Sequence, residues 1–255
     1  LVTSHIVAAV LDAIEHGTNM TMHYQPIIDA RTREISHYEA LVRISDPDSM
    51  ITPADIFPVV ARRRLEIELD KSVIRSIEQD LASGRFPAGI GVSINVSAPL
   101  LALLDFCEHF SGIVPYLEQH PIIIEVTETS LITHLQHASE CLQKLREKGF
   151  TVALDDFGSG YSSLRYLANM PVDIVKFDSS MVRALQQDEQ TRTMIHDMAR
   201  LIHNAGYTLV VEGIEHEQLL STVQPIEPEY LQGYLFGRPM PLDKLSTDLK
   251  VVNLE

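Results

Sequence analysis

The stretch Thr151–Leu167, TVALDDFGSGYSSLRYL, joins a short apolar run to two adjacent acidic residues and a glycine-rich turn. The run VAL at 152–154 predicts a buried strand, which ends on Asp155 and Asp156. The two glycines that follow allow the backbone to turn tightly. Paired carboxylates in this position suit a divalent cation bound by oxygen, although a solvated Asp-Asp turn is the simpler interpretation of the dipeptide alone.

Strand patterns and helix patterns alternate along the rest of the chain. Apolar runs predict strands at Met20–Asp29, Glu34–Ile44, Gly91–Val96, Ile122–Val126, Thr151–Leu154, Asp173–Phe177, Tyr207–Val211 and Tyr230–Phe236. The link at 30–33 has the length of a hairpin turn, so the first two strands are expected to be antiparallel. Eight strands with helices between the later ones predict an α/β fold, a (β/α)8 TIM-type barrel with one antiparallel strand.

The chain has no low-complexity linker or repeat that would divide it. We therefore expect residues 1–255 to form a single domain with a core from about 20 to 242. Because Leu1 is not an initiator methionine, we expect this domain to come from a longer signalling protein, whose other domains are its partners.

The composition excludes several classes of protein. A net charge of -15 argues against a DNA or RNA partner, which needs a basic surface. No apolar run reaches the roughly 20 residues of a membrane-spanning helix. Cys107 and Cys141 lack a metal-binding spacing, and the pairs His23 and His37, and His134 and His137, are too loose for zinc. We expect no membrane contact by this segment and a cytoplasmic location, with any membrane anchor elsewhere in the parent protein.

Polar side chains interrupt the predicted strands near the ends that meet at one rim of a barrel. They are Gln25, Glu39, Asn95, Glu125, Asp155, Asp156, Lys176, Glu212 and Gln232. Each alone is explained by a solvated edge or a turn cap, but Asn95, Glu125 and Lys176 lie in runs that look too apolar to be exposed. Burying unpaired carboxylates is costly, so their convergence predicts divalent cations among them. A ligand set made only of oxygen favours Mg²⁺ or Mn²⁺ over zinc or copper.

Such a site predicts phosphodiester hydrolysis. Two ions about 4 Å apart that share a bridging aspartate form the arrangement used for this reaction, in which one ion activates water and the other stabilises the phosphoryl oxygens. Arg43 is placed to bind a phosphate through two hydrogen bonds.

Short blocks of this sequence resemble, in order, those of the EAL-domain family, bacterial phosphodiesterases that linearise the second messenger cyclic di-GMP. The blocks are Glu39–Arg43, Tyr24–Ile27, Ser93–Ser97, Glu125–Glu128, Asp155–Gly158, Val175–Asp178, Glu212–Glu215 and Gln232–Tyr234. The resemblance implies a (β/α) barrel with one antiparallel strand, which agrees with the hairpin expected above. Ile44 stands where the family commonly has Trp, a departure that touches no expected ligand.

The resemblance also implies a role for individual residues. Glu39, Asn95, Glu125 and Asp155 would bind the first metal ion, and Asp155 and Asp156, with Glu212 directly or through water, would bind the second. Lys176 would orient or deprotonate the attacking water, and Gln232 would fix water or metal. Substrate would be bound by Gln25, Leu41 and Arg43, with Asp178, Glu215 and Pro239 as weaker assignments. Glu128 would brace the glycine loop after Asp156, a loop that in the family contributes to dimer contacts, so a homodimer is expected.

Two functions from different classes are therefore open. The first is metal-dependent hydrolysis of cyclic di-GMP to linear pGpG, with two Mg²⁺ or Mn²⁺ ions and inhibition by Ca²⁺, which activates water poorly. The second is a catalytically silent cyclic di-GMP receptor that signals to a partner. Family members in that role typically lose a metal ligand, the lysine or the glycine loop. All of these are present here, which favours the enzyme. A protein that acts only through its surface leaves the convergent carboxylates unexplained.

Overall fold

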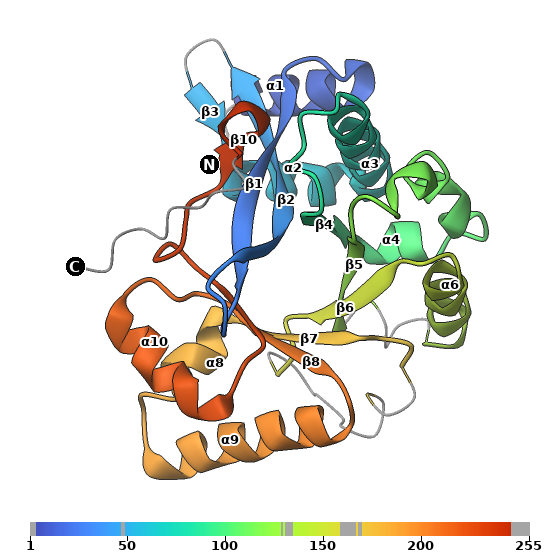
Figure 1. Cartoon of the computed structure of the whole chain (residues 1–255). Helices are drawn as coiled ribbons and strands as arrows, with labels where there is room; N and C mark the ends of the chain where they lie inside the picture. The colour runs from blue at the N-terminus through green and yellow to red at the C-terminus, as the bar shows by residue number, and fades with distance from the viewer. Residues whose placement is uncertain are drawn as a thin grey trace.

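The computed structural model describes residues 4–46, 49–128, 130, 135–158, 167 and 170–245, in which eight strands close into a barrel (Figure 1). The strands follow the order β1, β9, β8, β7, β6, β5, β4, β2 around the barrel, and pairing between β1 and β2 closes it. They are β1 (Met20–Asp29), β2 (Ile35–Asp46), β4 (Gly91–Val96), β5 (Ile122–Thr127), β6 (Thr151–Asp155), β7 (Ile174–Phe177), β8 (Thr208–Val211) and β9 (Tyr230–Gln232). The predicted α/β barrel is confirmed.

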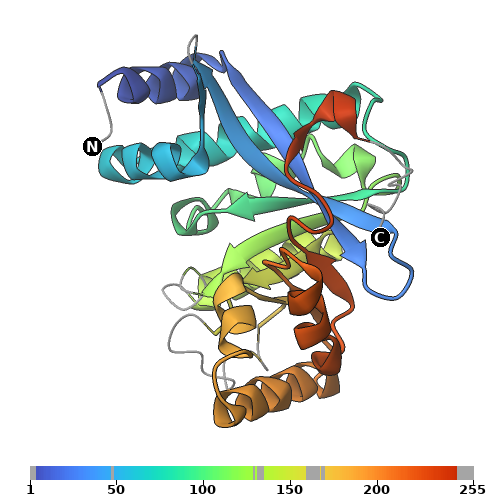
Figure 2. The same cartoon turned by 90° about the vertical axis from the view of Figure 1, so that its left-hand side faces the viewer.

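One strand of the barrel runs against the others. β1 pairs antiparallel with both β2 and β9, whereas the remaining neighbours are parallel. The turn between β1 and β2 is held by Asp29, whose Oδ1 accepts hydrogen bonds from the backbone N–H groups of Arg31 and Thr32, both at 2.8 Å. The long hairpin predicted from the short polar link is therefore present (Figure 2). Two short strands, β3 (Ser49–Ile51) and β10 (Met240–Pro241), extend the sheet beside β2 and β1.

Helices cover the outside of the barrel (Figures 1 and 2). They are α1 (Ser4–His16), α2 (Pro53–Arg63), α3 (Glu66–Ala82), α4 (Ala98–Leu101), α6 (Leu135–Glu147), α8 (Ser179–Ala184), α9 (Glu189–Asn204) and α10 (Glu217–Val223), with short 3₁₀ turns η1 (Phe106–Phe110), η2 (Val114–Tyr116), η3 (Gln224–Ile226) and η4 (Leu242–Lys244). α3 and α6 pack on β4 and β6, and α8 and α9 pack on β7 and β8. Within the described part of the chain, no helix combines the length and the hydropathy that a membrane-spanning helix needs.

The structure corrects two expectations about the strands. β9 ends at Gln232, whereas the apolar pattern predicted a strand to Phe236. The chain leaves the sheet at Gly233, which lies so close to the backbone of Ile214 that an added Cβ would clash with its carbonyl oxygen. The Leu235 N–H then bonds to this same oxygen at 3.0 Å. The second correction concerns Asn95, whose side chain is exposed at the barrel mouth although its strand is otherwise buried.

Both cysteines of the chain are free thiols, as the sequence predicted. Cys141 is buried in α6, and Cys107 lies on the turn η1, where its Sγ is 3.4 Å from the carbonyl oxygen of Cys141.

Candidate active site

The floor of the barrel consists of small and branched apolar side chains that point inward. Ile27, Ile123, Ala153, Ile174 and Val210 form a separate buried cluster. Successive side chains on a strand alternate between its faces, so a residue two positions away points into the same interior. Two residues from each member of the cluster, toward the open end of the barrel, lies a polar residue. These residues are Gln25, Glu125, Asp155, Lys176 and Glu212. The alternation of the strands thus gathers these polar groups above an apolar floor.

Lys176 is the cation at the centre of this layer. Its side chain is 1% exposed, and its Nζ donates a hydrogen bond of 2.7 Å to Glu125 Oε2. The same Nζ lies 2.6 Å from Glu212 Oε1 and 3.7 Å from Asp155 Oδ1. Burial by itself lowers the pKa of Lys176, but the surrounding carboxylates, Glu125 first, outweigh it and raise that pKa well above its usual value. Lys176 is therefore an ammonium group in this arrangement.

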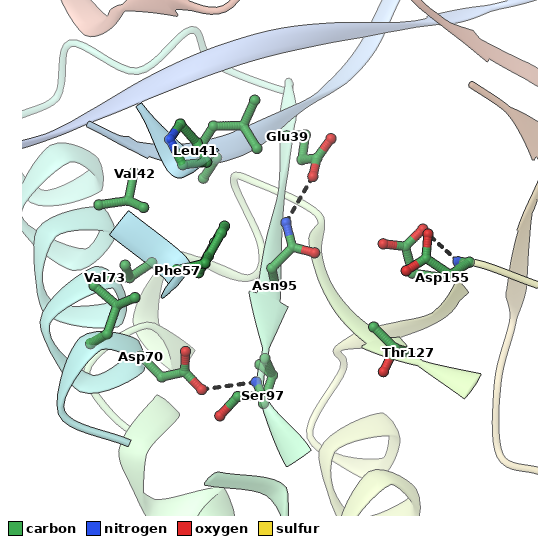
Figure 3. Close-up of a pocket in the computed structure, with 15 residues that line it drawn as sticks. Glu39, Leu41, Val42, Phe57, Asp70, Val73, Asn95, Ser97, Thr127 and Asp155 are labelled. Carbon is green, nitrogen blue, oxygen red and sulfur yellow. Dashed lines mark hydrogen bonds between the residues drawn. The ribbon is translucent and has the colours of Figure 1, made fainter. Parts of the chain in front are cut away.

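Glu39 forms a second centre on β2. Its Oε1 accepts a hydrogen bond from Asn95 Nδ2 at 2.7 Å (Figure 3), and its Oε2 accepts one from Gln232 Nε2 at 2.6 Å. Gln232 Nε2 also lies 3.4 Å from Gln25 Oε1. Burial opposes ionisation of Glu39, but the charge of Lys176 and the two amide hydrogen bonds prevail and lower its pKa. Strands β1, β2, β4 and β9 thus contribute to one polar network.

Asp155 and Asp156 sit where β6 ends. Asp156 has a left-handed backbone with φ of 55°, and its N–H donates to Asp155 Oδ1 at 2.9 Å. Burial, together with the charges of Asp155 and Asp178, raises the pKa of Asp156. The glycine loop beyond Gly158 lies outside the described residues, so the expected bracing of that loop by the buried Glu128 lies outside them as well.

Negative charge exceeds positive charge in this layer. Glu39, Glu125, Asp155, Asp156 and Glu212 surround one buried lysine. Burial raises the pKa of Glu125 to about 8 and that of Glu212 to about 7, with Lys176 offsetting part of the effect in each case. Neighbouring buried carboxylates bind protons more tightly when no cation compensates their negative charges.

The donor set fits divalent cations, although the side chains are not arranged around one. Among the described residues, no cluster of three or more His, Cys, Asp or Glu side chains is arranged so that it could hold a metal ion. The carboxylates instead contact Lys176 and the amides. Three buried side-chain oxygens of the described residues nevertheless have no hydrogen-bond partner, Ser93 Oγ, Glu212 Oε1 and Gln232 Oε1. Of these, Glu212 Oε1 forms an ion pair with Lys176 Nζ, 2.6 Å away. A hard cation bound by oxygen would satisfy both the buried oxygens that lack a hydrogen-bond partner and the excess of carboxylates.

Two recesses open on either side of Glu39 and Leu41, which line both. The first, of about 380 Å³, is bounded on one side of Asn95 by apolar side chains and on the other by Asp155 (Figure 3). Its apolar wall consists of Leu41, Val42, Pro53, Phe57, Leu69 and Val73. The second recess, of about 300 Å³, is lined by Gln25, Glu212, Gln232, Tyr234 and their neighbours. Each recess has room for a group the size of a nucleotide base.

Other residues expected to bind substrate have varied surroundings. Arg43 is half-buried, and its guanidinium donates to the Val42 carbonyl at 2.8 Å. Asp178 is the N-cap of α8, where its Oδ1 accepts from the N–H groups of Ser180 and Met181. Pro239 is partly buried beside β1 and lines neither recess. Glu215 is exposed and lines the second recess.

The structure adds three recess-lining residues to which the sequence analysis assigned no role, Phe57, Asp70 and Tyr234. Asp70 Oδ2 accepts a hydrogen bond of 2.8 Å from the Ser97 N–H, two residues after Asn95 (Figure 3). Burial raises its pKa to about 6. The available signal was an aspartate directly beside the buried stripe of α3, between Leu69 and Val73.

An acidic barrel mouth with an antiparallel first strand defines the class of this protein, and the chain belongs to the EAL-domain family, whose model matches residues 7–239. It is 34% identical to the cyclic di-GMP phosphodiesterase NbdA of Pseudomonas aeruginosa, over 92% of this chain and 31% of that protein. It is 31% identical to the cyclic di-GMP phosphodiesterase PdeB of Shewanella oneidensis, over 91% of this chain and 28% of that protein.

Solved structures show the same likeness. The PaMucR phosphodiesterase in complex with c-di-GMP has a TM-score of 0.82 at 26% identity, covering 92% of this chain and 97% of that one. An EAL domain protein from Listeria monocytogenes EGD-e has a TM-score of 0.78 at 31% identity, covering 92% and 94% of the two chains. The chain spans about a third of the length of the curated relatives it matches.

Proposed function

We propose that this chain hydrolyses one phosphodiester bond of cyclic di-GMP to give linear pGpG. The observation that carries the proposal is the convergence of five carboxylates and Lys176 between two recesses that share Glu39 and Leu41. The similarity to relatives named as cyclic di-GMP phosphodiesterases supports the choice of substrate.

We propose Mg²⁺ or Mn²⁺ as the cofactor, in two sites. Glu39, Asn95, Glu125 and Asp155 would hold one ion, and Asp155 and Asp156, with Glu212, would hold the other. Bound there, divalent ions supply an activated water and stabilise charge on the phosphoryl oxygens. The excess of carboxylates over cations in this layer supports such a site.

The side chains of this protein then orient the attacking water and fix the metal ligands. Lys176 is charged, so we assign it the role of orienting the attacking water as a hydrogen-bond donor, and not that of removing its proton. Gln232 fixes Glu39 by its hydrogen bond and keeps a free Oε1 that faces the same layer. The apolar floor below excludes water from the far side of the site.

The two recesses match the two guanine bases of the substrate. The carboxylate of Asp70 lines the first, and its Oδ2 accepts the Ser97 N–H. A carboxylate only accepts hydrogen bonds, and guanine presents neighbouring N–H donors where adenine presents an acceptor. We assign Asp70 the role of selecting guanine in this recess. The second recess offers Tyr234, which is 48% exposed.

Incubation of the purified chain with cyclic di-GMP and Mg²⁺ or Mn²⁺, followed by chromatography of the nucleotides, tests the proposal. We expect linear pGpG to appear, and no product at any concentration of either metal would refute it. Binding of cyclic di-GMP without product would identify a receptor instead of an enzyme.

We also propose that the chain acts as a homodimer in the cytoplasm, as one domain of a larger protein. The two free cysteines support a reducing compartment. Light scattering after size-exclusion chromatography tests the dimer, for which we expect twice the mass of the 255-residue chain.

A further inference from the structure

Phe57 is an unusually placed aromatic residue on α2. Its side chain is 54% exposed, whereas its neighbours Ile56 and Val60 on the same helix are 0% and 2% exposed. The ring lies with Leu41 and Val42 in the wall of the first recess, on the side of Asn95 away from Asp155 (Figure 3). An exposed phenylalanine at the entrance to a catalytic pocket presents an apolar face to whatever enters.

The position of Phe57 separates it from ordinary surface apolar residues. The described part of the chain exposes six large hydrophobic side chains. Leu104, Val114, Met194 and Leu201 line neither recess, whereas Phe57 lines the first and Tyr234 the second. Single exposed apolar residues need no explanation in general, but an exposed aromatic ring in each of two adjacent recesses indicates a shared role in binding.

The helix that carries Phe57 is firmly anchored. Pro53 occupies the first turn of α2, and the Thr52 hydroxyl donates to Asp55 Oδ2 at 2.9 Å. Ile56, Val59 and Val60 are buried and fasten the helix to the core. The backbone that carries the ring is thus fixed before a ligand arrives, which reduces the entropic cost of binding.

We propose that Phe57 is a base-stacking residue, on which one guanine of the cyclic dinucleotide lies with its hydrogen-bonding edge toward Asp70. The inference rests on the proposed function and extends it to a residue outside the sequence blocks whose resemblance first suggested the family. Leu41, Val42 and Val73 provide the remaining apolar surface, and Asp70 provides the polar end of the recess. Stacking of a base on an aromatic ring strengthens binding by about five- to a hundredfold.

Kinetics of matched variants test the role of the ring. Phe57→Leu keeps apolar bulk without a ring, and we expect its KM for cyclic di-GMP to rise about tenfold while kcat changes less than about twofold. Phe57→Tyr keeps the ring, and we expect its KM to stay within about twofold of the wild type. Met194→Leu, at an exposed position on α9, is the control and should change neither constant. A KM for Phe57→Leu equal to that of Phe57→Tyr would overturn the inference.

A binding measurement separates this inference from the proposed function. The chain contains no Trp, so Phe57→Trp creates a single indole in the recess, whose emission should be quenched when guanine stacks on it. We expect saturable quenching by cyclic di-GMP in the presence of Ca²⁺, and none in the control Met194→Trp. Quenching without hydrolysis by the wild type would leave the inference standing and refute the enzyme. Hydrolysis by the wild type without quenching would overturn the inference alone.

Discussion

Replacing Lys176 by Met tests the electrostatics of the site most directly. The substitution removes the charge that lies 2.7 Å from Glu125 and 2.6 Å from Glu212, and it leaves a side chain of similar volume. Breaking a buried ion pair by removing one partner costs about 3–5 kcal/mol, because the other charge stays buried without compensation. In EDTA we therefore expect the free energy of unfolding to fall by about 4 kcal/mol, or Tm to fall by roughly 10 °C for a chain of this size.

Urea unfolding, followed by circular dichroism, measures this loss. Lys144→Met, at an exposed position on α6, is the matched control and should change stability by no more than about 0.5 kcal/mol. Addition of Mg²⁺ should stabilise Lys176→Met more than the wild type, because a bound cation replaces the missing charge. Adding Glu125→Gln to Lys176→Met should restore part of the loss, since it removes the carboxylate left unpaired. A Lys176→Met protein as stable in EDTA as the Lys144→Met control would refute the reading of Lys176 as the cation that holds the carboxylates together.

Substitutions at Glu39, Gly233 and Asp70 test the acidic layer, the end of β9 and the first recess. Glu39→Ala should reduce hydrolysis of cyclic di-GMP by at least about a hundredfold in a chromatographic assay, because it removes the acceptor of two amide hydrogen bonds and an expected metal ligand; undiminished kcat would exclude Glu39 from the site. Gly233→Ala should destabilise the chain by about 2 kcal/mol or more in thermal unfolding, since its Cβ would meet the Ile214 backbone and push the segment beside Gln232 out of place, and an unchanged Tm would contradict this. The pKa of Asp70 is raised to about 6 in the folded chain, so the native state binds a proton that the unfolded state has lost, and stability falls as pH rises from about 4 to 7. Over this range the free energy of unfolding of Asp70→Asn should therefore gain about 2 kcal/mol relative to the wild type in urea unfolding. A constant difference between the two proteins would show that Asp70 titrates normally.

Much of the barrel was predictable because most of its strands coincide with apolar runs in the sequence. The bounds of β1 and β4 agree with the prediction, and the antiparallel hairpin follows from a four-residue polar link. β9 was overextended because residues 233–236 continue an apolar pattern, although a close backbone contact at Gly233 ends the strand. Such a contact joins segments that a local pattern cannot connect.

The polar layer was predictable for a related reason. A charged residue within a buried strand, such as Glu125 or Lys176, contradicts its apolar surroundings and so attracts attention. Phe57 and Asp70 do not contradict their helices, because each lies at the edge of an apolar stripe where either exposure or burial is ordinary. Only the packing of α2 and α3 against the barrel mouth gives these two residues their place in a recess.

The polar network between Gln25 and Gln232 unites side chains 207 positions apart, from the first and last strands of the barrel. During synthesis, the edge of β1 that pairs with β9 therefore has no partner strand until β9 has left the ribosome. A partly made chain has neither a closed wall nor a complete catalytic layer. On the proposed function, hydrolysis of cyclic di-GMP can therefore begin only after the last strand of the barrel has joined the sheet.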